Sequence, residues 1–199
     1  MQPESRFVES SGVIHHYLEW GSPDNPNVVM FHAVGMCSQI WNNAARDLAR
    51  DYHVLSFDLR GHGDTEHAQG EYTFQQIGED VASVIQTMGL EGSIGVGHSA
   101  GGMSMLIADS LVPGIVSKGV LVDTRVGNSP MSMLTPEQQK TRTERTLQKR
   151  TIWESREVMY TAYRDRRAFK SWTDEVFADY IEGATRPLDD GRVKLKCDP

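Results

Sequence analysis

The chain has 199 residues, 39% of them hydrophobic, which is enough to bury one sizeable core. Its formal net charge is -7 and its pI is about 5.5, so it lacks the positive surface that phosphate backbones require, and we expect no nucleic-acid partner. The two cysteines, Cys37 and Cys197, are too far apart in sequence and too isolated to indicate a disulfide framework or a zinc site.

The amino-terminal segment MQPESRFVESSGV has neither the basic start nor the apolar stretch of a secretory signal. The longest apolar runs in the chain span only a handful of residues, whereas a membrane-spanning helix needs about 20. Together with the low cysteine content, these features predict a cytoplasmic protein that has no membrane partner.

Short apolar runs recur along the first 122 residues, with helical patterns between them. The runs lie at 14–20, 27–31, 53–57, 93–96 and 118–122. This alternation predicts a mostly parallel sheet whose strands are joined by crossover helices. Shorter helices are predicted at 41–49 and 101–110.

The clearest helix in the sequence runs from about Phe74 to Met88. Thr73 and Gln76 form a capping box at its start, and Gly89 is a stop signal. Apolar residues recur on one face at helical spacing; they are Ile77, Val81, Val84, Ile85 and Met88.

The character of the sequence changes after Val126. Residues 127–130 are turn-like, and the sixty-odd residues that follow contain no convincing strand. Thr135 and Pro136 are predicted to open a helix as its N-cap and its first helical residue.

We therefore predict two domains. Residues 1–128 form the amino-terminal part of the core, and residues 129–199 form a helical lid and begin the return to the core. The segment 137–170 contains ten Lys or Arg and five Asp or Glu, a net charge of +5 that leaves -12 for the rest of the chain. An alternative to a lid is that these charged side chains only keep the outer faces of the helices solvated.

Residues 97–101 read Gly-His-Ser-Ala-Gly and match the pattern G-x-S-x-G, directly after an apolar strand and directly before a helix. This context projects the Ser99 hydroxyl from the carboxyl edge of the sheet, and small neighbours avoid clashes in the sharp turn. The helix that follows offers unpaired amides where an oxyanion would develop, and the amide of Ala100 is one such donor. We predict that Ser99 is a nucleophile.

The same residues also satisfy a looser pattern. Residues 95–100 fit the G-x-G-x-x-A fingerprint of dinucleotide-binding sites, with Asp123 as a ribose ligand. Two other segments, FHAVG at 31–35 and DLRGHGDT at 58–65, are not needed by a dinucleotide site. They therefore favour the nucleophile over the dinucleotide site.

The three motifs FHAVG, DLRGHGDT and GHSAG, in this order and spacing, resemble the α/β-hydrolase superfamily. The resemblance implies a three-layer α/β fold with a mostly parallel sheet and a helical lid, and it implies no cofactor and no metal. It also implies that the amide of Val34 joins the amide of Ala100 in an oxyanion hole. Ala33 stands where the family usually has Gly.

In this superfamily the chain order is nucleophile, acid, histidine. None of the seven histidines follows Ser99; they are His15, His16, His32, His53, His62, His67 and His98. We therefore expect the resemblance to cover only about three quarters of the family's usual length, with the carboxyl-terminal strands and the catalytic histidine absent from this chain. Asp123 is a candidate acid, because a minority of the superfamily draws its acid from the end of the sixth strand.

The histidines of this chain are predicted to have structural roles. By resemblance, His32 orients its own loop, and Arg60 and His62 tie loops together. His98 is next to the nucleophile, but adjacent residues in such a turn point apart. The other histidines near these motifs lack the carboxylate or thiolate neighbours typical of metal sites and are interpreted as surface or loop residues; they are His15, His16, His62 and His67.

The sequence predicts a metal-independent serine hydrolase of a small ester, lactone or related acyl substrate, acting through an acyl-enzyme on Ser99. Apolar side chains near the Ser99 turn or the lid entrance are candidate substrate contacts, although a Met-rich stripe is more often core packing; they are Met36, Trp41, Met103, Met131 and Met133.

Several alternatives stay open. One is a catalytically incomplete hydrolase fold that serves as a binding module. Another is a carbon-carbon bond hydrolase, an acyltransferase or a cofactor-free haloperoxidase on the same scaffold. Epoxide hydrolases and dehalogenases are disfavoured because those relatives place Asp where Ser99 stands. Association into a homo-oligomer is compatible with the sequence.

Overall fold

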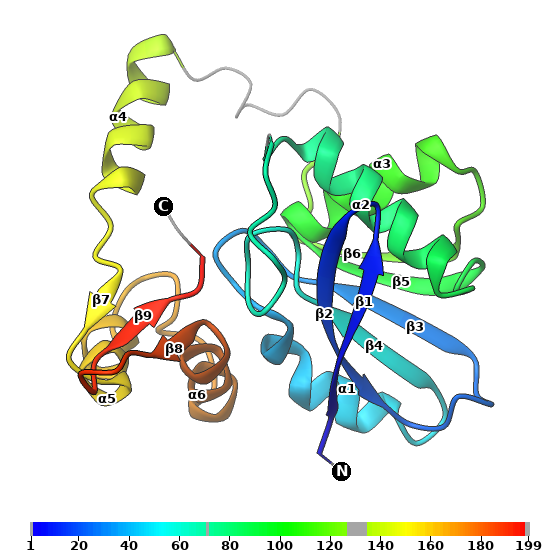
Figure 1. Cartoon of the computed structure of the whole chain (residues 1–199), viewed down its shortest axis with the longest axis horizontal. Helices are drawn as coiled ribbons and strands as arrows, with labels where there is room; N and C mark the ends of the chain where they lie inside the picture. The colour runs from blue at the N-terminus through cyan, green and yellow to red at the C-terminus, as the bar shows by residue number, and fades with distance from the viewer. Residues whose placement is uncertain (1, 71, 127–134, 198–199) are drawn as a thin grey trace.

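The computed structural model describes residues 2–70, 72–126 and 135–197. A six-stranded sheet forms the larger part; its strands are β1 (Glu4–Ser10), β2 (Val13–Trp20), β3 (Asn27–Phe31), β4 (His53–Phe57), β5 (Ser93–His98) and β6 (Val116–Val122). Their spatial order is β1-β2-β4-β3-β5-β6 (Figure 1). The pairs β1-β2 and β2-β4 are antiparallel, and the three remaining pairs are parallel. The predicted mostly parallel sheet is confirmed.

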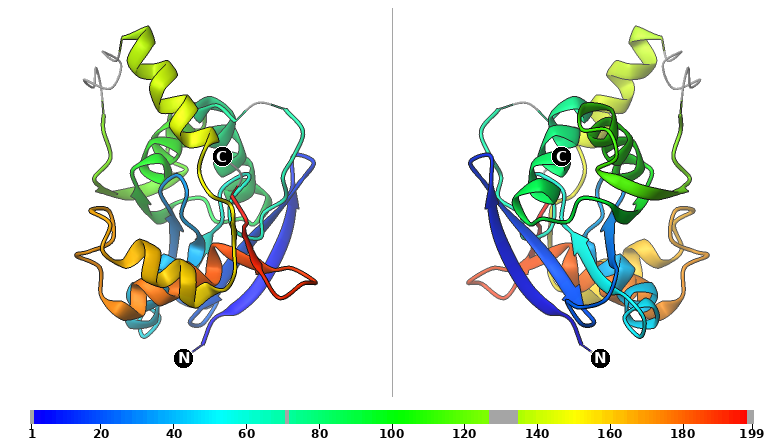
Figure 2. Two further views of the ribbon diagram at one scale, coloured as in Figure 1. Left: turned by 90° about the vertical axis from the view of Figure 1, so that its left-hand side faces the viewer. Right: turned by 90° about the vertical axis from the view of Figure 1, so that its right-hand side faces the viewer.

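Helices cover both faces of this sheet; they are α1 (Asn42–Leu48), α2 (Phe74–Thr87) and α3 (Ala100–Leu111). Side chains alternate between the faces of a strand, so Val29 and Phe31 of β3 join the core cluster that packs with α2 and α3. Val28 and Met30 join the opposite cluster, which contains Ala45 of α1. The predicted three layers are therefore present (Figure 2).

Helix α2 begins and ends where the sequence indicates. The Thr73 hydroxyl accepts a hydrogen bond from the amide of Gln76 at 3.1 Å, and Gly89 takes a φ of +65° just after the helix. The helix predicted at 41–49 is confirmed as α1, and a 3-10 turn, Ser38–Trp41, precedes it.

The residues after 134 form a second set of elements, here called the C-terminal group. Its elements are α4 (Pro136–Leu147), β7 (Ile152–Trp153), α5 (Arg156–Arg164), α6 (Asp174–Gly183), β8 (Thr185–Pro187) and β9 (Val193–Leu195). The predicted start of α4 is confirmed, because Thr135 and Gln138 form a reciprocal capping box with Pro136 in the first turn.

The expectation of no strand in this region is wrong. The three short strands form an antiparallel sheet in the order β7-β9-β8. Strands of two or three residues are too short to display a period of two, which is why the sequence pattern does not reveal them. The C-terminal group also has its own apolar core, which includes Met159, Phe177 and Tyr180.

The C-terminal group packs against the loop that follows β3. Cys37 is fully buried in its core, and Met36 and Ile40 pack against the same cluster. Figure 1 shows α5, α6 and β7–β9 gathered beside the sheet, with α4 standing away from both parts. None of the described helices is long and apolar enough to cross a membrane.

Strand β6 forms one edge of the described sheet. Its outer residues Val120, Leu121 and Val122 are 51%, 39% and 41% exposed. An edge of this kind offers unpaired backbone groups next to apolar side chains.

Candidate active site

Ser99 lies in the turn between β5 and α3 with a φ of 50° and a ψ of −107°. A residue with a side chain enters this region at a cost of about 1–3 kcal/mol, and it stays there only where the surroundings enforce it. The Ser99 amide donates to the carbonyl of Val122 at 2.9 Å, and its carbonyl accepts from the amide of Met103 at 3.0 Å. Within the described part of the chain, the Ser99 hydroxyl has no hydrogen-bond partner.

The glycines on either side of Ser99 permit a very close approach of backbone to backbone. A Cβ atom on Gly97 would lie 2.4 Å from the Cα of Gly102, and one on Gly101 would lie 2.3 Å from the carbonyl oxygen of Phe31. Neither contact can be relieved by moving a side chain. The pattern G-x-S-x-G is thus required sterically, and it holds the start of α3 against the end of β3.

The loop after β3 carries the residues expected to supply the second oxyanion amide. Val34 is 61% exposed, while Ala33 is buried. The carbonyl of Ala33 accepts from the amide of Met36 at 3.1 Å, and Gly35 has a φ of +77°. Because Gly101 touches Phe31, this loop and the Ser99 turn emerge at the same edge of the sheet. Ala100 is buried in the first turn of α3.

His32 is fully buried beside this loop. Its Nε2 accepts a hydrogen bond from the amide of Leu59 at 3.0 Å, so its Nδ1 carries the proton and donates to the carbonyl of Ala33 at 2.8 Å. Burial, together with the neighbouring His62, lowers the pKa of His32 to about 4. The ring is neutral at pH 7 and both nitrogens are engaged with backbone groups.

His62 and Arg60 hold the loop that follows β4. The Nε2 of His62 accepts from the amide of Gly35 at 2.9 Å, and its Nδ1 donates to the carbonyl of Arg60 at 2.9 Å. The Arg60 guanidinium donates to both carboxylate oxygens of Asp80 in α2, at 2.6 and 2.7 Å. These contacts tie the loops after β3 and β4 to each other and to α2, as the resemblance implies.

Asp123 follows β6 with a φ of 46° and is exposed. Its charge acts on His98: desolvation lowers the pKa of His98, and Asp123 partly opposes that effect. The described residues show no hydrogen bond that connects Asp123 to Ser99. A role for Asp123 as catalytic acid therefore stays a prediction.

The interpretation of His15 and His16 as surface residues without a carboxylate neighbour is wrong. Both are buried, at 3% and 1% exposure. The Nδ1 of His16 lies 2.6 Å from Oδ2 of Asp58. The same carboxylate accepts from the amide of Ser38 through Oδ1 and from the amide of Asp64 through Oδ2. No local sequence signal indicates this pair, because its members are 42 residues apart.

His16, Asp58 and Asp64 are close enough together to hold a metal ion, since their ligand atoms all lie within 4.8 Å of one another. In this structure the Asp58 carboxylate is engaged by His16 and by backbone amides. Asp64 pairs with Lys196 at 2.6 Å. These contacts account for the cluster as a structural network.

The predicted substrate contacts lie in different surroundings. Met36 packs against the core of the C-terminal group, whereas Trp41 packs against the core cluster that contains Ala45. Met103 is half-buried on α3. Met131 and Met133 lie outside the described residues. Contact of any of the five with substrate stays a prediction.

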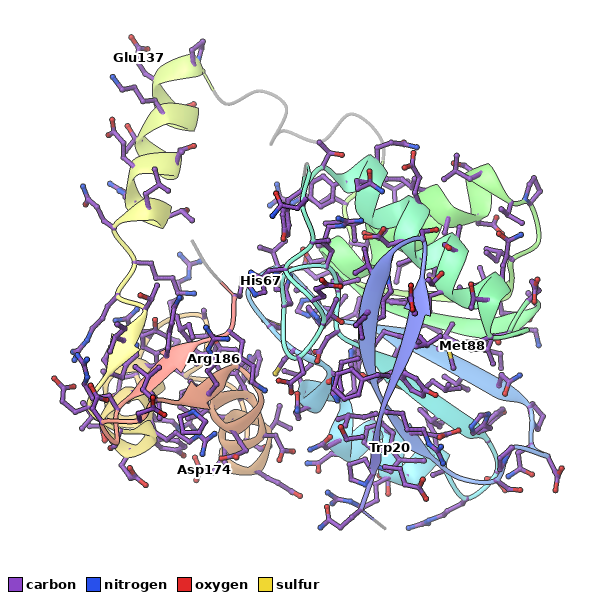
Figure 3. All side chains as sticks on the ribbon, viewed as in Figure 1. Trp20, His67, Met88, Glu137, Asp174 and Arg186 are labelled. Atoms are coloured by element: carbon purple, nitrogen blue, oxygen red, sulfur yellow. The ribbon has the colours of Figure 1, made fainter. Side chains whose placement is uncertain are left out.

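A polar cavity of about 540 Å³ lies where the loop after β4 meets the C-terminal group. Residues 63–67 line one side, and Arg186 and Lys196 line the other. Figure 3 labels His67 and Arg186 on the two parts that face each other here. The Lys196 ammonium pairs with Asp64, and the His67 Nε2 donates to the Lys196 carbonyl at 2.8 Å. These contacts join the C-terminal group to the core.

A family model described as alpha/beta hydrolase fold matches residues 26–188. The chain belongs to this family. Its strained serine turn and its parallel sheet agree with that assignment.

Curated relatives are similar in sequence to part of this chain. A non-heme chloroperoxidase of Streptomyces lividans is 32% identical over 116 residues, which cover 57% of this chain and 42% of the relative. A bifunctional esterase/perhydrolase of Acinetobacter calcoaceticus is 29% identical over 113 residues, which cover 56% of this chain and 41% of the relative. The matched part therefore spans less than half the length of these relatives.

Solved structures match nearly the whole chain. An E-2-(acetamidomethylene)succinate hydrolase has a TM-score of 0.83 at 20% identity, covering 98% of this chain and 69% of that one. A thioesterase domain from the curacin biosynthetic pathway has a TM-score of 0.82 at 24% identity, covering 100% of this chain and 71% of that one. At this level of identity, the similarity shows the fold.

Proposed function

We propose that Ser99 is the nucleophile of a hydrolase that acts on a small ester, lactone or related acyl substrate. The observation that carries the proposal is the backbone of Ser99, held at a φ of 50° between β5 and α3 by glycines that allow no side chain. Strain of this kind persists where the surrounding structure enforces it, and here it presents a hydroxyl that is hydrogen-bonded to none of the described residues.

In the proposed reaction, the Ser99 oxygen attacks the substrate carbonyl and a general base takes the hydroxyl proton. The amides of Val34 and Ala100 stabilise the oxyanion, the leaving group departs with the proton, and water hydrolyses the acyl-enzyme. His32 and His62 cannot be the base, because backbone groups engage both ring nitrogens of each. The family's chain order assigns the base to a histidine that follows Ser99, and residues 100–199 contain none.

We further propose that the C-terminal group selects the substrate as a lid. Two observations support this role: its core takes in Cys37 from the loop that also carries Val34, and Lys196 joins it to the loop after β4. Both loops follow parallel strands at the edge where Ser99 lies. Exchanging residues 131–196 for the equivalent segment of a relative should change substrate preference and leave the reaction type unchanged.

A second candidate function is perhydrolysis, in which hydrogen peroxide instead of water attacks the acyl-enzyme and releases a peracid. It is favoured by the names of two relatives, the chloroperoxidase and the esterase/perhydrolase. Both candidates share the acyl-Ser99 intermediate. Assaying peracid formation from acetate and hydrogen peroxide separates them.

The nucleophile is tested by trapping. The chain is incubated with a large excess of a fluorophosphonate, long enough to label a serine that lacks its general base, and the labelled peptide is identified by mass spectrometry. We expect the label on Ser99 and its loss in Ser99→Ala. The matched control is Ser110→Ala, which removes an exposed hydroxyl near the other end of α3. A label that survives Ser99→Ala at an unchanged rate would remove Ser99 from the mechanism.

The oxyanion amide of Val34 is tested by Val34→Pro, which deletes that donor. Loss of one such donor typically costs about 3 kcal/mol of transition-state stabilisation, roughly a hundredfold in rate. A change below twofold in acylation of Ser99 would exclude the Val34 amide from the site.

A further inference from the structure

A second serine outside the Ser99 site is connected to a buried histidine and a carboxylate. The Ser5 oxygen in β1 lies 2.9 Å from Nε2 of His16 in β2. The Nδ1 of the same ring lies 2.6 Å from Oδ2 of Asp58. The three side chains thus form a continuous hydrogen-bonded chain from the molecular surface to the protein interior.

The direction of these hydrogen bonds follows from the chemistry of the three groups. Burial alone would raise the pKa of Asp58, but the hydrogen bond from His16 and the nearby imidazoles bring it below its usual value. The carboxylate is therefore ionised and can only accept, so Nδ1 carries the proton in the imidazole form of His16 that acts as a base. Its Nε2 is then an acceptor, and the Ser5 hydroxyl donates to it. This is the arrangement in which a histidine takes the proton of a serine nucleophile.

The orienting carboxylate is held firmly. The Oδ1 of Asp58 accepts from the amide of Ser38 at 2.6 Å, and Oδ2 accepts from the amide of Asp64 at 3.0 Å. The backbone of His16 is fixed as well, because its amide donates to the Thr65 hydroxyl at 2.9 Å. The ring therefore keeps one orientation toward Ser5.

The Ser5 hydroxyl is accessible, and an apolar side chain lies beside it. Ser5 is exposed, whereas His16 is only 1% exposed. The register pairs Phe7 with His16, which places Ser5, Phe7 and His16 on one face of the sheet. The Phe7 ring lies 5.1 Å from the imidazole between centroids and is 57% exposed. An acyl group that approaches Ser5 can pack on Phe7.

From this geometry we propose that Ser5 is a second acyl acceptor, activated by His16 and Asp58, for activated carboxylic esters. The Ser5 oxygen forms a bond to the ester carbonyl carbon as His16 takes the hydroxyl proton. The bond from carbon to the leaving alcohol oxygen then breaks, and His16 returns the proton to that oxygen. The products are acyl-Ser5 and the free alcohol or phenol, with no change in oxidation state.

The rate advantage comes from general-base assistance, which contributes about 10²–10⁴-fold in enzymes. The matched reference is Ser117, an exposed serine on the opposite edge strand β6. Its hydroxyl donates to the carbonyl of Ser93 and is not hydrogen-bonded to a histidine among the described residues. We expect acylation of Ser5 to be roughly a hundredfold faster than acylation of Ser117.

The test uses the full chain with Ser99→Ala, so that the proposed nucleophile does not consume the reagent. The protein is treated with p-nitrophenyl acetate, and acetylation of each serine is followed by peptide mass spectrometry. Hydroxylamine treatment and fragment ions distinguish the Ser5 ester from an acetylated amino terminus. Failure of Ser99 to react with a fluorophosphonate leaves this measurement intact, so the two proposals fail separately.

Two results are expected: a Ser5 rate that exceeds the Ser117 rate, and a fall of Ser5 to the Ser117 level in His16→Gln. Because His16 is buried, that variant has to be checked for folding by circular dichroism. If it unfolds, the comparison is repeated on the parent chain in guanidinium, where the two serine rates should become equal. Equal rates in the folded parent, or a Ser5 rate that neither His16→Gln nor unfolding lowers, would overturn the proposal.

Discussion

Gly101→Ala is expected to disable the Ser99 turn although it adds only one methyl group. The new Cβ would lie 2.3 Å from the carbonyl oxygen of Phe31 and 2.7 Å from that of His32. The optimal van der Waals separation of non-bonded heavy atoms is about 3.5 Å, so the start of α3 must move away from β3 by about 1 Å. Overpacking of this kind costs about 1–3 kcal/mol, and a 1 Å misplacement of reacting groups costs about a hundredfold in rate.

Two measurements on this variant check the reasoning. Thermal unfolding should show a Tm lowered by between about 2 and 12 °C for a chain of this size, and fluorophosphonate labelling of Ser99 should slow by about a hundredfold. The matched control is Gly119→Ala in β6, where the new atom would meet only the end of the Met105 side chain at 3.3 Å. We expect the control to remain within twofold of the parent.

The two readouts also separate stability from geometry. If Gly101→Ala kept the parental Tm and labelling rate, the close approach of α3 to β3 would not be what positions Ser99. If it lowered the Tm and left labelling unchanged, the contact would serve stability alone.

Further predictions concern the supports of the site and the sheet edge. Asp80→Ala should lower the free energy of unfolding, measured by chemical denaturation, by about 3–5 kcal/mol, because it leaves the Arg60 guanidinium buried without a partner. The control Glu79→Ala, on the exposed face of α2, should lower it by less than about 0.5 kcal/mol. His32 has a folded pKa of about 4 and an unfolded value of 6.5, so its contribution to stability is present above pH 6.5 and falls by about 3 kcal/mol toward pH 4; His32→Gln should flatten that slope in urea titrations. Val120→Lys should reduce self-association measured by light scattering, because it puts a charge on the apolar edge of β6. An unchanged mass distribution would show that this edge does not cause the association.

The serine turn was predictable from sequence because its constraints are local. Residues 97–101 must combine a positive φ with backbone contacts that exclude side chains, so they use glycine and alanine at fixed offsets from Ser99. Helix α2 was predictable for the same reason, since its N-cap and its apolar face lie within 16 residues. Once β3 is recognised as a strand, the alternation of its side chains predicts which of them lie on each face of the sheet.

The remaining features depend on contacts between distant residues. The hydrogen bond between His16 and Asp58 joins positions 42 residues apart, and the pair of Arg60 with Asp80 joins a loop to a helix. Neither leaves a periodic or compositional trace. Strand β7 was missed because it gains its pairing from a distant part of the chain, with Ile152 opposite Lys194. Strands β8 and β9 are joined by a short turn, but they have only three residues each, too few to show a period of two.

The hydrogen bonds of the histidines limit which of them can serve Ser99. A general base needs a ring nitrogen that can reach the serine hydroxyl. In His16, His32 and His62 both nitrogens are already hydrogen-bonded, and His53 is held the same way by Asn27 and Glu19. His98 differs, because it adjoins Ser99 and feels the charge of Asp123. Sustained ester turnover by residues 1–199 alone would therefore leave His15, His67 and His98 as the histidines to test by substitution, whereas its absence would agree with a base that follows Ser99 in the family's order.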